Sequence, residues 1–149
     1  MLHSSPFYTT LIACSDETIP SDLFIETMYY LERVGWVDYA HPGSVELGQS
    51  VKEAAAGAEV IMMRNHGVVL FDESFPEALL RLQTLEMTCR MVVEAKAAGV
   101  ALKRIPADTA REFLHGGRYK PRRPWHALPH SPSVSTSDAL CFSSNPVSS

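Results

Sequence analysis

The residues of this sequence that could do chemistry centre on His66, which lies between two short apolar runs. Residues 60–63 and 68–71 are rich in β-branched side chains, so both runs predict buried strands. Gly67 lets the chain turn between them in a conformation that a Cβ atom would strain. A histidine at such a turn can point its imidazole into a cleft. His66 and its neighbour Asn65 are therefore either hydrogen-bonded turn residues or part of a metal-binding or catalytic site.

Three carboxylates near His66 in the sequence are candidates for a general acid or base. Asp72 and Glu73 stand between the second strand and the next helix, where they are expected to shape the turn. Glu86 falls within that helix and is expected to be a polar partner on it. None of the three is assigned to catalysis, and the catalytic residue stays unknown from the sequence.

The composition is that of an ordinary globular protein. Of the 149 residues, 46% are hydrophobic and 20% are charged, which predicts one compact domain with a real core. The net charge of -4 argues against general nucleic-acid binding, which needs a basic surface to neutralise phosphates. No run is long and apolar enough to predict a membrane span, and the first residues lack the basic segment and apolar core that would predict a signal sequence.

Cysteine usage indicates the compartment. Cys14, Cys89 and Cys141 are far apart and form no Cys-x-x-Cys pair, so neither a disulfide framework nor a zinc ribbon is predicted. A reducing cytoplasm is the expected location.

Helix start and stop signals place the elements around this centre. Ser5 before Pro6 predicts a capped helix start, and Ser74 opens the longest helix in the form of a capping box. Gly99 is expected to end that helix. The predicted helices span 7–14, 21–35, 44–56, 74–99 and 105–116, with a short strand or extended link over 36–40.

The amino-acid composition changes after Gly117. Residues 118–126 are basic, and a Ser/Pro-rich segment without periodicity follows, which is expected to be disordered. The basic cluster is either a solvated extension or a contact for an anionic ligand or a neighbouring subunit. The expected organisation is one folded domain over 1–117 and a tail over 118–149.

Four segments, taken in order, resemble the class II aldolase/adducin family, which includes fuculose-phosphate and ribulose-phosphate aldolases. The similarity runs from residue 2 to about residue 100 and is most specific as an ordered set. The segments are Leu2-His-Ser-Ser-Pro-Phe-Tyr8, Ala40-His-Pro-Gly-Ser44 with Leu47-Gly48, Arg64-Asn-His-Gly67, and Glu77-Ala78 at the start of a long helix.

The resemblance implies a fold, an activity and partners. The fold is α/β, a three-layer α/β/α sandwich with a mainly antiparallel central sheet, here without the family's N-terminal part. The activity is that of a metal-dependent aldehyde-lyase, by retro-aldol cleavage or decarboxylation, on a sugar phosphate or related hydroxy-carbonyl compound. The partners are this small-molecule substrate and further copies of the chain in a homo-oligomer, typically a tetramer. Neither nucleic acid nor a membrane is implied.

Enzymes that this sequence resembles hold a divalent metal, usually zinc, with three histidines. By that resemblance His3 matches the first ligand and His66 the third, while the second falls on Ser5. A hydroxyl is a poorer zinc ligand than an imidazole, so weak binding or none is expected. His41 is the nearest further imidazole that could replace the missing ligand. The family's Gly-rich phosphate loop and catalytic carboxylate have no counterpart in this sequence.

Three functions therefore stay open. The first is a metal-dependent lyase with an atypical ligand set, or part of a longer active enzyme. The second is a noncatalytic member, like the adducin head domains, in which the fold serves oligomerisation and protein association. The third is a truncated remnant without independent function, because a sheet that lacks its first strands has unpaired edges.

Overall fold

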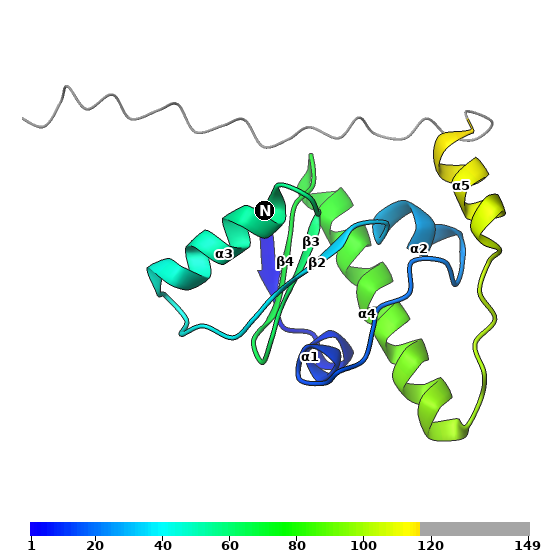
Figure 1. The fold of residues 1–149 in the computed structure, drawn as a ribbon, viewed down its shortest axis with the longest axis horizontal. Helices are drawn as coiled ribbons and strands as arrows, with labels where there is room; N and C mark the ends of the chain where they lie inside the picture. Colours follow the sequence, from blue (N-terminus) through cyan, green and yellow to red (C-terminus); the bar gives the residue numbers. More distant parts are fainter. Residues whose placement is uncertain (117–149) are drawn as a thin grey trace, which may run out of the picture.

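The computed structural model describes residues 1–116, which form an α/β fold around a four-stranded mixed sheet in the order β1-β4-β3-β2 (Figure 1). The predicted tail over 118–149 lies outside the described residues. The strands are β1 (Leu2–Ser4), β2 (Val34–Val37), β3 (Val60–Met63) and β4 (Gly67–Leu70). The helices are α1 (Phe7–Ala13), α2 (Ile25–Tyr30), α3 (Val45–Ala55), α4 (Phe75–Ala98) and α5 (Ala107–His115).

The sheet is mainly antiparallel, as predicted. β4 pairs antiparallel with β1 on one side and with β3 on the other, while β2 pairs parallel with β3. All residues of β3 and β4 are buried, because helices cover both faces of these strands.

Two apolar clusters fill the space between the sheet and its helices. Alternate residues of β3 and β4 point to opposite faces, as the period of a strand requires. One face packs against α1 and α4 and the other against α3, and Figure 1 shows these helices on opposite sides of the sheet. The first set is Val60, Met62, Val68 and Leu70, and the second is Ile61, Met63 and Val69. The expected α/β/α layering is confirmed.

The predicted boundaries of α3 and α4 are confirmed by their caps. The hydroxyl of Ser44 accepts a hydrogen bond from the Leu47 amide at 3.1 Å, and that of Ser74 accepts one from the Glu77 amide at 3.4 Å. Gly99 ends α4 in the left-handed conformation, with φ 68°. Within residues 1–116, no helix is long and apolar enough to cross a membrane.

One prediction about the N-terminal third is wrong, and one strand there was not predicted. The helix expected over 21–35 is only α2, and Gly35 lies within β2 instead of ending a helix. Close packing explains this glycine, since a Cβ atom there would lie 3.2 Å from the Ala58 Cβ and 3.3 Å from the Ile61 Cδ1. Strand β1 was not predicted, because three residues are too few to show an alternating pattern.

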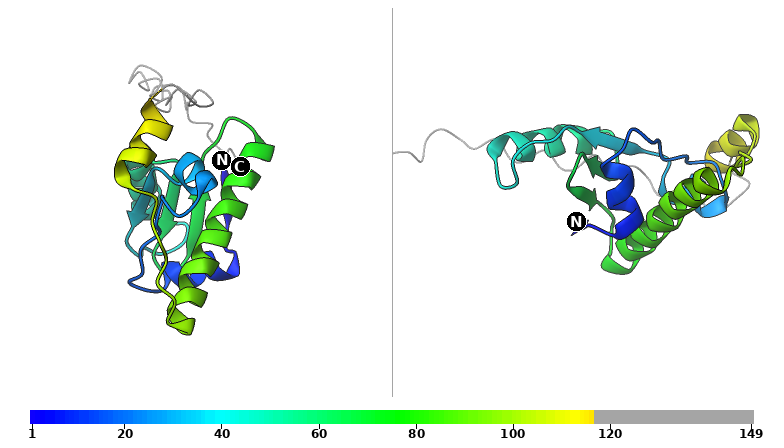
Figure 2. Two further views of the ribbon diagram at one scale, coloured as in Figure 1. Left: turned by 90° about the vertical axis from the view of Figure 1, so that its right-hand side faces the viewer. Right: turned by 90° about the horizontal axis from the view of Figure 1, so that it is seen from below.

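Helix α5 lies beside α2, at the end of the molecule away from α3 (Figures 1 and 2). It contributes no buried residue. The Ile105 amide donates to the Asp22 carbonyl at 2.7 Å, and Arg104 forms an ion pair with the Asp22 side chain. At the other end, His115 Nε2 lies 3.6 Å from a Glu32 carboxylate oxygen. These contacts hold α5 to the segment around α2 at both of its ends.

Candidate metal centre

His66 lies in the tight turn that joins β3 to β4. Asn65 adopts the left-handed conformation with φ 55°, and Gly67 has φ 145°, which favours glycine. The Asn65 amide donates to the Ala13 carbonyl at 3.1 Å, and the His66 amide donates to the Met63 carbonyl at 3.2 Å. Backbone conformation and hydrogen bonds therefore fix where the His66 side chain leaves the chain.

His3 reaches the same region from β1, where its register places it opposite Val69 of β4. Its Nδ1 lies 2.9 Å from the carbonyl oxygen of Val68. A carbonyl oxygen only accepts, so Nδ1 carries the proton and the lone pair of the neutral ring is on Nε2. Metal-binding histidines are oriented in this way, with one ring nitrogen held by a backbone acceptor and the other left to coordinate.

The structure brings the two predicted ligands together. The ring centroids of His3 and His66 are 5.1 Å apart, and their planes meet at 86°. The Nδ1 atom of His66 is buried and has no hydrogen-bond partner among the described residues. A buried polar atom without a partner is costly, so a ligand at this position would relieve that cost. Two neutral imidazoles are donors that suit a divalent transition metal.

The side chain of Ser5 forms a hydrogen bond with the backbone of the β3–β4 turn. Its hydroxyl donates to the His66 carbonyl oxygen at 3.1 Å, which ties the end of β1 to the β3–β4 turn. This differs from the predicted cap, because the residue before α1 is Pro6 and no side chain of that residue caps the helix. A Cβ atom on Gly67 would lie 2.6 Å from the Ser5 Oγ, so the two segments are tightly packed.

The donor set fits a metal in part. Among residues 1–116, no group of three His, Cys, Asp or Glu side chains is placed to hold a metal, so His41 does not complete a set with His3 and His66 there. His41 is exposed in the turn before α3. Catalytic zinc sites use three protein ligands and a water. The described residues therefore supply two of the three protein ligands that such a site needs.

Asp72 shapes the turn between β4 and α4, as predicted. One carboxylate oxygen accepts from the Glu73 amide at 2.8 Å, and the other lies 3.0 Å from two guanidinium nitrogens of Arg81. The side chains of Asp72 and Arg81 are only 1% and 8% exposed, so this is a buried ion pair. Removing one partner of such a pair typically costs about 3–5 kcal/mol. The pair therefore has a structural role, in which it holds the β4–α4 turn against helix α4.

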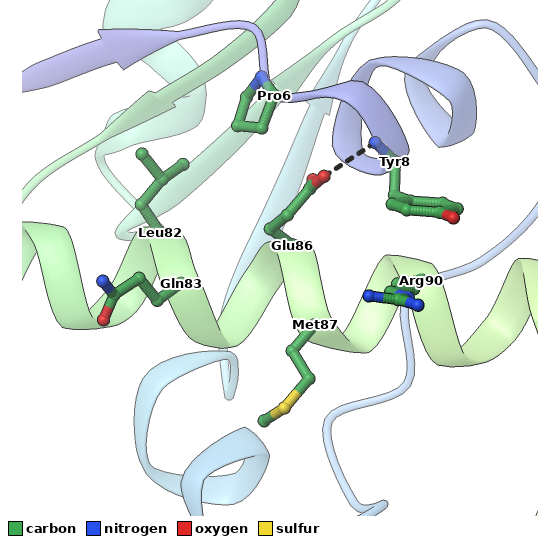
Figure 3. Close-up of a pocket in the computed structure, with 7 residues that line it drawn as sticks. All are labelled: Pro6, Tyr8, Leu82, Gln83, Glu86, Met87 and Arg90. Carbon is green, nitrogen blue, oxygen red and sulfur yellow. Dashed lines mark hydrogen bonds between the residues drawn. The ribbon is translucent and has the colours of Figure 1, made fainter.

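Glu86 caps helix α1 from the facing helix α4 (Figure 3). Its carboxylate accepts hydrogen bonds from the amides of Tyr8 at 2.9 Å and Thr9 at 2.8 Å, and from the Thr9 hydroxyl at 2.7 Å. A negative charge here compensates the unpaired amides of the first turn. Sequence reasoning missed this role, because the partners are 77 and 78 residues apart and no local motif links them.

An apolar pocket of about 520 Å³ lies between α1 and α4 (Figure 3). It is on the sheet face that these helices cover, whereas His3 is opposite Val69, which packs against α3. The pocket is therefore separate from the histidine pair. It is lined by Pro6, Tyr8, Leu82, Gln83, Glu86, Met87 and Arg90.

Fold and site together define an α/β domain of the class II aldolase type, with histidines from β1 and from the β3–β4 turn. Residues 1–93 match the Class II Aldolase and Adducin N-terminal domain, and the chain belongs to this family. The resemblance stated from the sequence motifs is confirmed. Enzymes of this family are metal-dependent.

Curated relatives include two kinds of enzyme. An L-fuculose phosphate aldolase of Methanocaldococcus jannaschii is 26% identical over 93 residues, covering 62% of this chain and 50% of that protein. A 3-oxo-tetronate 4-phosphate decarboxylase of Escherichia coli O6:H1 is 32% identical over 96 residues, covering 61% of this chain and 44% of that protein. The chain thus spans about half the length of the curated relatives that it matches.

Solved structures agree with this assignment. YgbL from Escherichia coli matches with a TM-score of 0.61 and 26% identity, over 74% of this chain and 54% of that one. A sugar-phosphate aldolase from Thermotoga maritima matches with a TM-score of 0.59 and 25% identity, over 70% of this chain and 46% of that one.

Proposed function

We propose that this chain is a metal-dependent lyase that acts on a small phosphorylated hydroxy-carbonyl compound, by retro-aldol cleavage or by decarboxylation. The observation that carries the proposal is the His3 and His66 pair, in which the Val68 carbonyl fixes the tautomer of His3. The names of the relatives support both reaction types, since they include an L-fuculose phosphate aldolase and a 3-oxo-tetronate 4-phosphate decarboxylase.

In this proposal His3 and His66 hold a divalent metal, zinc by preference, through imidazole nitrogens. A bound metal supplies Lewis-acid stabilisation of negative charge on a substrate oxygen. The Val68 carbonyl keeps the His3 ring in the coordinating orientation, and the turn at Asn65 and Gly67 positions His66. The third ligand and the acid or base that moves the substrate proton come from outside the described residues or from a second subunit.

Two further features of the proposal concern the setting. We place the protein in the cytoplasm, because Cys14 and Cys89 are both free thiols. We also propose a homo-oligomer, which would allow a neighbouring subunit to complete the site.

An activity assay with the substrates of the two kinds of relative tests this function. The purified protein, supplied with zinc, is expected to cleave L-fuculose 1-phosphate or to decarboxylate 3-oxo-tetronate 4-phosphate. His66→Ala is expected to abolish the activity and His41→Ala to preserve it, since His41 is exposed and outside the pair. Equal activity in wild type and His66→Ala would overturn the proposal.

One observation favours a second candidate, a noncatalytic association domain. The hydroxyl of Ser5, at the position matched to the second metal ligand, is used to tie two segments together. A protein of this kind is expected to form a stable oligomer in the presence of a metal chelator and to show no lyase activity. Light scattering with and without the chelator, beside the activity assay, separates the two candidates.

A further inference from the structure

A cleft lies between α2 and α5. These two helices are at the end of the molecule away from α3 (Figures 1 and 2). The volume of the cleft is about 690 Å³. Apolar and aromatic side chains make up most of its walls, with Ile25, Met28 and Tyr29 on α2, and Ile105 and Phe113 on the α5 side. This composition suits an aromatic or aliphatic occupant.

The walls of the cleft are incompletely covered by the described residues. Ile25 is 60% exposed, and no residue of α5 is buried. Burying such surface is favourable, and an exposed apolar patch of this kind commonly marks a binding surface. An occupant between the two helices would cover both walls at once.

Three carboxylates line the cleft or belong to the segments that form it. Glu26 lines it, Glu32 follows the C-terminal end of α2, and Glu112 lies on α5. Of the neighbouring basic side chains, Arg104 and Arg111 form ion pairs with aspartates, and His115 lies beside Glu32. A basic and aromatic segment would complement this surface in both charge and apolar character.

Such a segment follows α5 directly in the same chain. We propose that residues 118–128 fold back into the cleft, with Trp125 against its apolar walls and the basic residues before it beside the carboxylates. The segment reads Arg-Tyr-Lys-Pro-Arg-Arg-Pro-Trp-His-Ala-Leu, from Arg118 to Leu128.

The arrangement of the two helices gives this segment the required reach. The hydrogen bond between Ile105 and Asp22 joins the starts of α2 and α5, and the contact between His115 and Glu32 joins their ends. The chain therefore leaves α5 beside one end of the cleft. Helix α5 has 9 residues. At 1.5 Å per helical residue it is roughly 13 Å long, a distance that about four extended residues cover. Residues 118–125 exceed that length even after a reversal at the glycines 116–117.

Fluorescence of Trp125 in the full-length protein tests the proposal. The sequence has two tryptophans, so the difference between wild type and Trp125→Phe isolates the emission of Trp125. We expect this emission to lie to the blue of free tryptophan amide and to resist quenching by acrylamide. Phe113→Ser is expected to shift it to the red and to expose it to the quencher. Met87→Ser, which changes an exposed side chain in the separate pocket between α1 and α4, is the control and is expected to change neither.

Charge reversal and dilution complete the test. Glu26→Lys is expected to shift the Trp125 emission to the red, as Phe113→Ser does. This variant leaves the apolar walls of the cleft in place, so it tests the proposal even if Phe113→Ser disturbs α5. Emission that does not change on dilution supports docking within one chain. The proposal would be overturned if the Trp125 emission of the wild type equals that of free tryptophan amide. A red shift on dilution would also overturn it, because it would show that the segment comes from a second copy of the chain.

Discussion

The imidazole rings of His3 and His66 meet edge to face, with centroids 5.1 Å apart, although the two residues are far apart in the sequence. Antiparallel pairing of β1 with β4 makes this contact possible, because it places the N-terminal strand directly beside the strand that follows His66. The same pairing brings the Ser5 hydroxyl to 3.1 Å from the His66 carbonyl oxygen. Position 5 is therefore adjacent to the pair.

This adjacency predicts that Ser5→His creates a stronger metal site. A third imidazole completes the ligand set of a catalytic zinc site. Four-ligand zinc sites bind with about 10–16 kcal/mol, so one ligand contributes roughly a quarter of this, and zinc affinity is expected to rise well over tenfold. Zinc titration calorimetry of wild type and variant measures the change.

Two variants control for this result. Ser5→Ala removes the hydrogen bond to the His66 carbonyl without adding a donor, so its zinc affinity is expected to equal that of wild type. The double variant with His66→Ala is expected to lose the gain. If Ser5→His binds zinc no better than Ser5→Ala, position 5 does not face the same ion as His66.

A second prediction concerns Gly67, which holds the turn in its conformation. Its φ of 145° is unfavourable for a side chain, and a Cβ atom would lie 2.6 Å from both the Ser4 carbonyl oxygen and the Ser5 Oγ. Backbone strain and overpacking each cost about 1–3 kcal/mol, so Gly67→Ala is expected to lower the free energy of unfolding by about 2–6 kcal/mol. Urea denaturation measures this change.

Gly48→Ala is the matched substitution. Gly48 lies within α3, and no atom would be within 4 Å of an added Cβ. Alanine is the better helix former by up to about 1 kcal/mol, so this variant is expected to be as stable as wild type or slightly more stable. A Gly67→Ala protein that unfolds at the urea concentration of wild type would show that the turn adjusts to the side chain.

Features that depend on local sequence were predictable. The strands on either side of His66 follow from β-branched runs, and the starts of α3 and α4 follow from Ser44 and Ser74, whose partners are three residues away. The motifs also indicated His3 and His66 as a pair, and the structure places their rings in contact. Their role as metal ligands stays a prediction.

Features that depend on distant partners were not predictable from the sequence. Ser5 reads as a helix cap, but the turn between β3 and β4 supplies the carbonyl oxygen that accepts its hydrogen bond. The cap of α1 comes from Glu86 on another helix. Gly35 reads as a helix end, but it lies in strand β2, where an added Cβ atom would be in tight contact with the side chains of Ala58 and Ile61. In each case a tertiary contact outweighs a local preference.

A third prediction concerns pH and the buried thiol of Cys89. Burial in the core raises the pKa of this thiol from its ordinary value of 9.0 to about 12. A hydrogen bond with Thr9 lowers the pKa and the negative charge of Glu86 raises it, but both effects are smaller than that of burial. Between these two values the folded protein keeps the proton that the unfolded chain loses. Unfolding then releases a proton, so stability must fall as pH rises from 9 towards 12.

The difference between wild type and Cys89→Ala isolates this contribution. The variant is expected to be less stable at pH 7, because it leaves a cavity, but to lose stability less steeply above pH 9. The slopes are expected to differ by up to about 1.4 kcal/mol per pH unit. Cys14→Ala is the control, because Cys14 is exposed, and its slope is expected to match wild type. Parallel curves for wild type and Cys89→Ala, from urea denaturation at several pH values, would mean that water reaches the thiol before the domain unfolds.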